Sequence, residues 1–269
     1  MRTLNMKTIP NNPQLTYYSL HDSAVAFSTT RHGGCSIGNY SSFNINEYCG
    51  DNADNIAANR QSLCSLLGIE GSKLVMPHQT HGTNVRQIAE EFFSLPDNIK
   101  KMLLEDVDAV MTNVKGICIG VSTADCVPII IYDPQHQAAC VVHAGWRGTV
   151  VRIIEQALKA MTLAYHTNLA DLKVVIGPSI SLDSFEVGNE VYQQFAEKGF
   201  PMDAIARKMG DKWHIDLWEC NKLLLESFGV PSVNIHVDGE CTFANPDKYF
   251  SARRLGIQSG RIFTGVMIK

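Results

Sequence analysis

The sequence predicts a single-domain α/β (α+β) protein built as a mixed-sheet α/β sandwich. Short apolar runs rich in β-branched residues alternate with amphipathic helical patterns along the 269 residues. Several neighbouring runs are separated by a few residues, too few for a helical crossover, which favours antiparallel pairs within a mixed sheet. No internal repeat or long linker divides the chain. We therefore expect one catalytic domain over residues 1–269, with residues 1–20 as an N-terminal extension.

The expected strands share an apolar, β-branched composition and are bounded by turn-forming residues. In chain order they are 74–76, 85–88, 109–112, 117–121, 127–132, 138–142, 174–176, 233–237 and 262–268. The most polar interruption, residues 90–106, falls between the second and third of these strands. We expect a helical or looped insertion there.

Four segments have apolar residues at helical spacing. The clearest begins at Thr149 and continues at i, i+3 and i+4 through Met161. The other three stop at glycine, a residue that commonly terminates helices: 56–67 before Gly68, 190–198 before Gly199 and 217–228 before Gly229.

Composition and charge disfavour several classes of protein. The chain is 45% hydrophobic and 19% charged, as in ordinary globular domains. A net charge of -4 and a pI near 6.1 lack the basic surface of a nucleic-acid binder. No stretch has the length and continuity of a signal peptide or a transmembrane helix, so we expect a cytoplasmic protein that binds no nucleic acid and no membrane. The eight cysteines include no C-x-x-C pair, which disfavours a zinc ribbon or thioredoxin-type site.

Three short segments combine residue types that bind metals. They are the 77–82 segment PHQTHG, the 123–128 segment TADCVP and the 143–148 segment HAGWRG. Each lies at the end of an expected strand or in a turn, where rigid neighbours hold a side chain in place. Cys126, His143 and one of His78 or His81 would give zinc three ligands and leave a fourth position open. The alternative is that these histidines are hydrogen-bonded structural residues.

The segment from His143 to Thr149 also suits an anion. An expected strand is followed there by Gly-Trp-Arg-Gly and then by the helix that opens at Thr149. Free N–H groups at a helix start favour anions, and the planar guanidinium of Arg147 matches phosphate. The alternative is that Gly145 and Gly148 shape a turn while the neighbouring tryptophan packs.

The motifs HQTHG, STADCVP and HAGWRGT occur in this order with TTRHGG, Asn59-Arg60, IGPSI, EVG and FSARR. In these motifs the chain resembles the bacterial laccase-like "multicopper polyphenol oxidase" family, whose members are regarded as purine nucleoside phosphorylases with adenosine deaminase activity. The resemblance spans about Thr29 to the C-terminus. It implies zinc, with copper as the alternative metal, on His81, Cys126 and His143, and it favours His81 over His78.

The resemblance also implies roles for other residues. Its arginine elements match Arg31, Arg60, Arg147, Arg253 and Arg254, of which we assign the first three to substrate or phosphate. Asp125, next to a ligand, is a candidate proton carrier or orienting residue, and the alternative is a turn-forming aspartate. Weaker candidates are Asn44 and Glu186. Ser179 departs from the family, since a cysteine is expected in its G-P-C-I element.

The implied reaction is phosphorolysis of adenosine, inosine and methylthioadenosine to a free base and a ribose 1-phosphate, with deamination of adenosine beside it. Purine nucleosides and phosphate are the expected partners, and the oligomeric state is left open. A copper oxidase is one rival, but the chain contains no H-x-H pair for a multicopper cluster. A thiol hydrolase with Cys126 as nucleophile and His143 as base is another. A metal-stabilised binding module without turnover is the third.

Overall fold

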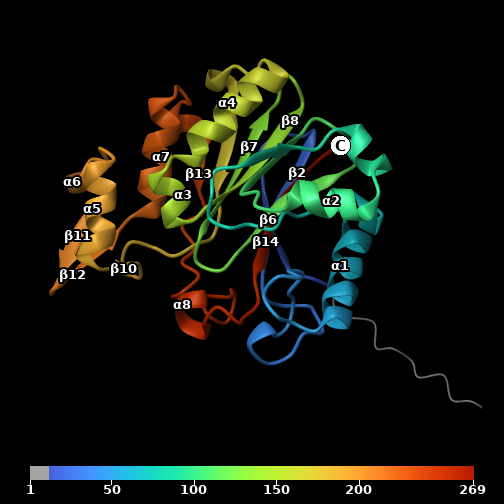
Figure 1. The fold of residues 1–269 in the computed structure, drawn as a ribbon, viewed down its shortest axis with the longest axis horizontal. Helices are drawn as coiled ribbons and strands as arrows, with labels where there is room; N and C mark the ends of the chain where they lie inside the picture. Colours follow the sequence, from blue (N-terminus) through green and yellow to red (C-terminus); the bar gives the residue numbers. More distant parts are fainter. Residues whose placement is uncertain (1–11) are drawn as a thin grey trace, which may run out of the picture.

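The computed structural model describes residues 12–269 and contains two large mixed sheets stacked face to face, with helices outside each (Figure 1). This arrangement confirms the predicted α/β sandwich. Residues 1–11 of the expected N-terminal extension lie outside the described residues. Within residues 12–20, Leu15–Tyr18 forms an edge strand of one sheet.

The six-stranded sheet has the order β13-β9-β7-β8-β5-β4. At its centre, β7 (Val127–Asp133) and β8 (Ala138–Ala144) form an antiparallel hairpin in which every residue is buried. The flanking strands are β9 (Lys173–Ile176), β13 (Ile235–Val237), β5 (Ala109–Thr112) and β4 (Val85–Gln87). The outer pairs β13–β9 and β4–β5 are parallel, and the inner pairs are antiparallel.

The five-stranded sheet has the order β1-β2-β14-β6-β3. Its strands are β1 (Leu15–Tyr18), β2 (Ala24–Thr29), β14 (Ile262–Ile268), β6 (Cys118–Thr123) and β3 (Leu74–Val75). The last strand of the chain, β14, lies in the middle and pairs antiparallel with β2 and β6. Its pairing places the residues just before β14 beside the end of β6.

The hairpin strands are apolar over most of their length because alternate side chains point to opposite faces of the sheet and both faces are covered. Ile129 and Ile131 point into a core shared with the helices, whereas Ile130 and Tyr132 point into the core between the sheets. This double burial explains why the sequence shows a continuous apolar run there and no alternation.

Helices cover the outer faces of both sheets. On one side lie α3 (Trp146–Val150), α4 (Ile153–Tyr165) and α7 (Leu217–Ser227), and on the other α1 (Ala53–Leu67) (Figure 1). The short helix α2 (Asp97–Leu104) packs Leu103 and Leu104 against the core between the sheets. The predicted helix from Thr149 is wrong as one element, because Arg152 has a φ of 63° and divides α3 from α4. The interruption at 90–106 contains the 3-10 helix Glu90–Ser94 and α2.

A small three-stranded sheet extends from the helical side of the sandwich. It consists of β10 (Glu186–Val187), β12 (Lys212–Ile215) and β11 (Ala206–Met209), with α5 (Asn189–Glu197) and α6 (Met202–Ile205) beside it. The remaining helices are α8 (Ala252–Leu255) and the 3-10 turns Gly38–Tyr40, Gly71–Lys73, Leu169–Asp171 and Ser232–Asn234. Within residues 12–269, none of the helices combines the length and apolarity needed to cross a bilayer.

Candidate metal centre

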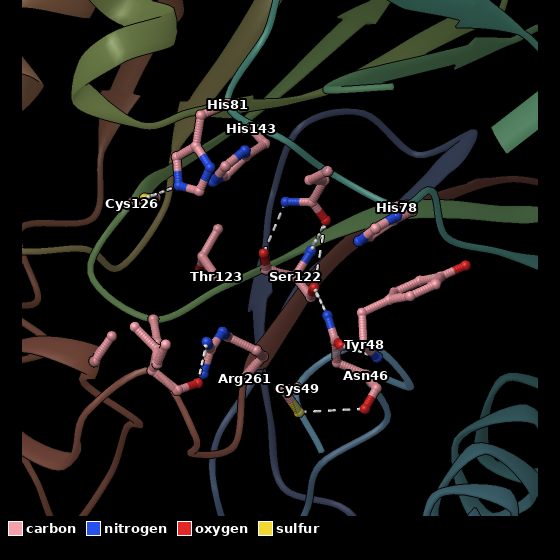
Figure 2. A pocket seen from close by; sticks show the side chains of 14 residues that line it. Asn46, Tyr48, Cys49, His78, His81, Ser122, Thr123, Cys126, His143 and Arg261 are labelled. Atoms are coloured by element: carbon pink, nitrogen blue, oxygen red, sulfur yellow. Dashed lines mark hydrogen bonds between the residues drawn. The ribbon is translucent and has the colours of Figure 1, made fainter. Parts of the chain in front are cut away.

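Three side chains from distant parts of the sequence meet at one end of the β7–β8 hairpin. His81 lies in the loop after β3, Cys126 in the connection between β6 and β7, and His143 near the end of β8. One donor atom from each lies within 4.8 Å of the others, and the distance from Cys126 Sγ to His81 Nε2 is 3.7 Å. Figure 2 shows the two imidazoles and the sulfur gathered at one corner of a cavity.

Asp108 holds two of these three residues in place. This carboxylate is fully buried, directly before β5, and accepts a 2.7 Å hydrogen bond from Nδ1 of His143. It also accepts hydrogen bonds from the backbone N–H groups of Thr80, His81 and Gly82 at 3.3, 3.0 and 2.7 Å. A carboxylate on one imidazole nitrogen directs the other nitrogen toward a metal. Asp108 therefore leaves Nε2 of His143 as the donor and fixes the loop that carries His81.

The backbone is shaped to bring the donors together. His81 has a φ of 68°, a left-handed conformation that turns the loop sharply. A Cβ added at Gly145 would lie 2.8 Å from Cδ2 of His81 and 3.1 Å from Sγ of Cys126. Glycine at position 145 thus permits an approach that other residues would obstruct.

The electrostatics favour a thiolate. Burial alone would raise the pKa of the Cys126 thiol, but the charge and hydrogen bonds of His143 and His81 lower it to about 6. Burial alone would lower the pKa of His143, but Cys126 and Asp108 raise it to about 9. Without a metal, the opposite shifts of the two groups favour a thiolate beside an imidazolium. An incoming cation would replace the proton on His143.

His78, the competing histidine, is tied elsewhere. Its Nδ1 lies 2.7 Å from Oε1 of Glu105, and its ring stacks on Tyr48 with the ring centroids 4.1 Å apart. It lines the same cavity as the three donors without joining their group. The geometry thus agrees with His81 as the ligand that the resemblance implies.

The cavity beside the three donors has a volume of about 250 Å³. Its floor is the end of β6, where the Gln79 side chain exchanges two 2.8 Å hydrogen bonds with the backbone of Ser122. The stacked pair Tyr48–His78 and the guanidinium of Arg261 line the other sides (Figure 2). The donors therefore face an open space with an aromatic wall and a cationic wall.

Asp125 faces away from this cavity. Its carboxylate accepts hydrogen bonds from the hydroxyls of Thr242 and Ser251 and from the N–H of Arg253, at 2.7, 2.9 and 2.7 Å. Its φ is 86°, so the residue also makes the tight turn before Cys126. These contacts attach residues 242–253 to the turn that carries Cys126.

The three arginines assigned to phosphate lie outside the cavity. Arg31 donates to the backbone carbonyls of Ser41 and Pro246, and Arg60 donates to that of Leu74. Arg147 is exposed, and its guanidinium lies 4.3 Å from the ring centroid of Trp146. The N–H of Thr149 is bonded to the carbonyl of Gly145, so the expected anion site at that residue has one donor fewer.

The weaker candidates have structural partners. Asn44 is buried and accepts the N–H of Arg261, and the carbonyl of Glu186 accepts a hydrogen bond from Arg253. The guanidinium of Arg254 donates to the carbonyl of Phe243. Ser179 is buried, where its hydroxyl accepts the Trp218 indole N–H.

Sequence reasoning missed Asp108, Arg261 and Tyr48. The one local signal for Asp108 in the sequence is its position as a charged residue directly before the apolar run 109–112. Neither Arg261 nor Tyr48 lies in a motif that indicates a binding role. The pairing of β14 with β6 brings Arg261 to the site, and the loop before α1 brings Tyr48 there.

The chain belongs to the family described as multi-copper polyphenol oxidoreductase laccase, whose model matches residues 25–269. Among individual relatives, a purine nucleoside phosphorylase of Bacteroides thetaiotaomicron is 46% identical over 244 residues, covering 90% of both chains. Adenosine deaminase RL5, from an unknown prokaryotic organism, is 43% identical over 246 residues, covering 91% of this chain and 94% of the relative.

Solved structures agree with the fold. The crystal structure of YlmD from Geobacillus stearothermophilus superposes with a TM-score of 0.88 at 27% identity, covering 97% of this chain and all of that chain. The Bacillus licheniformis hypothetical protein YfiH gives a TM-score of 0.87 at 25% identity, covering 96% of this chain and 97% of that chain.

Proposed function

We propose that this protein is a cytoplasmic, zinc-dependent purine nucleoside phosphorylase that cleaves adenosine, inosine and methylthioadenosine and also deaminates adenosine. The observation that carries the proposal is the group of His81, Cys126 and His143, which opens onto a cavity and includes no fourth side chain from residues 12–269. The names of the two relatives, a purine nucleoside phosphorylase and an adenosine deaminase, supply the substrate class.

The donor set fits zinc. Two imidazoles and one thiolate match the ligands of catalytic zinc sites, and the absence of a fourth side chain in the described group leaves room for substrate or water. Zinc in such a site supplies Lewis-acid polarisation of a substrate atom or activation of water. Copper, as the family description suggests, is the alternative metal.

The chain's own residues provide the rest of the site. Asp108 holds His143 in the required tautomer, and Gly145 gives the donors room to converge. The Tyr48–His78 stack offers a flat π-surface against which a purine can lie. The Arg261 wall places positive charge near the space where charge develops on substrate or leaving group.

We assign Asp125 to loop positioning and not to proton transfer. Its two carboxylate oxygens accept three hydrogen bonds from the C-terminal segment, and the residue does not line the cavity. A proton carrier must be within hydrogen-bond reach of substrate, which these contacts prevent.

One observation favours a second candidate, a thiol hydrolase. The Cys126 sulfur and a ring nitrogen of His143 lie within 4.8 Å of each other, and His143 lowers the pKa of the thiol, which is also the arrangement of a nucleophilic cysteine with its base. In that case metal would inhibit, and phosphate would have no effect on base release.

The test combines metal analysis with assays of base release from adenosine, with and without phosphate. We expect about one zinc per chain, phosphate-dependent release of adenine by the zinc-loaded protein, and loss of both zinc and activity in Cys126→Ala. Zinc retained in Cys126→Ala with activity lost, or activity increased by a chelator, would favour the thiol hydrolase. Oxidation of phenols as the dominant, copper-dependent activity would favour the oxidase.

A further inference from the structure

We propose that Arg261 and the hydroxyl of Thr123 form an anion subsite, on the wall of the cavity opposite the metal donors, that binds inorganic phosphate. This inference rests on the proposed function, which it deepens by placing the second substrate. Phosphate is thereby assigned to Arg261, which lines the cavity, and not to Arg31, Arg60 or Arg147, the arginines that the sequence suggested.

The guanidinium of Arg261 is held rigidly by the backbone of its own loop. Nη1 donates to the carbonyls of Ser259 and Gly260 at 2.6 and 3.0 Å, and Nη2 donates to the carbonyl of Ile257 at 2.8 Å. A guanidinium has five N–H groups. Nε–H and the second N–H of Nη2 therefore remain without an acceptor in the described part of the chain, and together they can donate to two oxygens of one tetrahedral anion.

Thr123 supplies an independent observation. Its side chain lines the cavity, is about 1% exposed, and its Oγ1 atom has no hydrogen-bond partner among residues 12–269. A buried hydroxyl without a partner costs free energy unless a ligand satisfies it. Thr123 pairs with Ile262 across the β6–β14 ladder, so it stands next to the strand entry that carries Arg261. Figure 2 shows Thr123 between Arg261 and the metal donors.

The charge in the cavity also favours an anion. Neither aspartate nor glutamate is among the described residues that line it. No carboxylate oxygen of residues 12–269 lies within 4.0 Å of the Arg261 guanidinium, which is therefore a cation without an ion-pair partner. By contrast, Arg31, Arg60 and Arg147 do not line this cavity.

This placement is consistent with the chemistry of phosphorolysis. An oxygen of HPO₄²⁻ forms a bond to the anomeric carbon as the bond from that carbon to the purine nitrogen breaks, and the electron pair leaves with the base. The proton of HPO₄²⁻ accounts for the N–H of the released purine. Arg261 and Thr123 would hold the attacking anion while the Tyr48–His78 wall holds the leaving base.

The experiment measures binding of inorganic phosphate to the zinc-loaded protein by calorimetry, with zinc content checked for every variant. We expect Arg261→Gln to raise the Kd for phosphate about 10- to 100-fold and Thr123→Val to raise it about 2- to 10-fold. Arg207→Gln is the matched control, because Arg207 is a surface residue paired with Asp183 outside the cavity, and its Kd should equal that of the unmodified protein.

Thr123→Val separates binding from folding, since the lost hydroxyl has no partner in the folded chain and its removal should not lower Tm. Unchanged phosphate affinity in both Arg261→Gln and Thr123→Val would overturn the subsite, as would a larger loss in Arg147→Gln than in Arg261→Gln. Failure of the proposed function is a different result: phosphate binds with the predicted variant pattern, but adenosine releases no base in response to it.

Discussion

The two ends of the β7–β8 hairpin contain the same interaction in different surroundings. At the turn, Asp133 accepts a 2.8 Å hydrogen bond from Nδ1 of His136, and at the cavity end Asp108 accepts one of 2.7 Å from Nδ1 of His143. Both carboxylates are buried. The His136 side chain is 34% exposed, however, whereas that of His143 is 4% exposed.

The difference lies in what meets the second imidazole nitrogen. His136 belongs to a local turn in which Asp133 also accepts the N–H groups of Gln135 and His136, a common use of aspartate in turns. His143 instead faces Cys126 and His81, two donors from other parts of the chain. An aspartate–histidine pair thus orients the imidazole ring, and it becomes part of a metal centre only where the tertiary structure brings further ligands to the second ring nitrogen.

The largest expected effect comes from removing the imidazole at the cavity end. His143→Ala should lose bound zinc and lower phosphate-dependent base release more than about 100-fold, because it removes a ligand and not merely a partner of one. Zinc content and adenine release check this. His136→Ala is the matched control and should keep both. Equal losses of zinc and activity in His143→Ala and His136→Ala would contradict the assignment of the metal centre to the cavity end.

Replacing the carboxylate at each end should also affect zinc binding only at the cavity end, with a smaller effect than loss of the imidazole. Asp108→Asn keeps all three donors and removes the charge that orients His143, so zinc affinity should fall about 10- to 100-fold. Competition with a zinc chelator measures it. Asp133→Asn should leave zinc affinity unchanged. Normal affinity in Asp108→Asn would mean that the backbone, and not this carboxylate, sets the ligand geometry.

Gly145→Ala tests the close approach at the cavity end. Its Cβ would lie 2.8 Å from His81 and 3.1 Å from Cys126, and relieving that overlap by moving the donors should cost about 1–3 kcal/mol, or roughly 5- to 150-fold in zinc affinity. Gly71→Ala is the control, since a Cβ there meets nothing within 4 Å. If Gly145→Ala binds zinc normally, the donors have more room than the structure indicates.

The smallest effect concerns the turn and its pH dependence. Burial alone would raise the pKa of Asp133, but hydrogen-bond donors, among them His136, lower it. A lowered pKa means that the ionised carboxylate stabilises the fold above its ordinary pKa and that this contribution disappears as pH falls below about 4. Asp133→Asn should therefore lower the free energy of unfolding by about 1–2 kcal/mol at pH 7. The difference should shrink in acid, as urea unfolding at several pH values would show; a constant difference would contradict this origin.

The sequence predicts the hairpin well and the edges of the fold poorly. Strands buried on both faces are continuous apolar runs, so β7 and β8 are recognisable, whereas β1 and the small β10–β12–β11 sheet are short and partly exposed. Of the site, Cys126, His143 and one of His78 or His81 were predicted because metal-binding residue types stand in turns or at strand ends, and the family resemblance favoured His81. Asp108 and Arg261 were not, since their roles depend on contacts between segments far apart in the chain.

The central claim is that the cavity end of the hairpin binds one metal through three protein ligands. X-ray absorption spectroscopy at the zinc edge of the zinc-loaded protein tests it most directly, because sulfur and imidazole scatter distinguishably. We expect one sulfur, two imidazoles and one further light atom that changes when phosphate or adenosine is added. A spectrum without sulfur, or one with four protein ligands that no substrate perturbs, would contradict it.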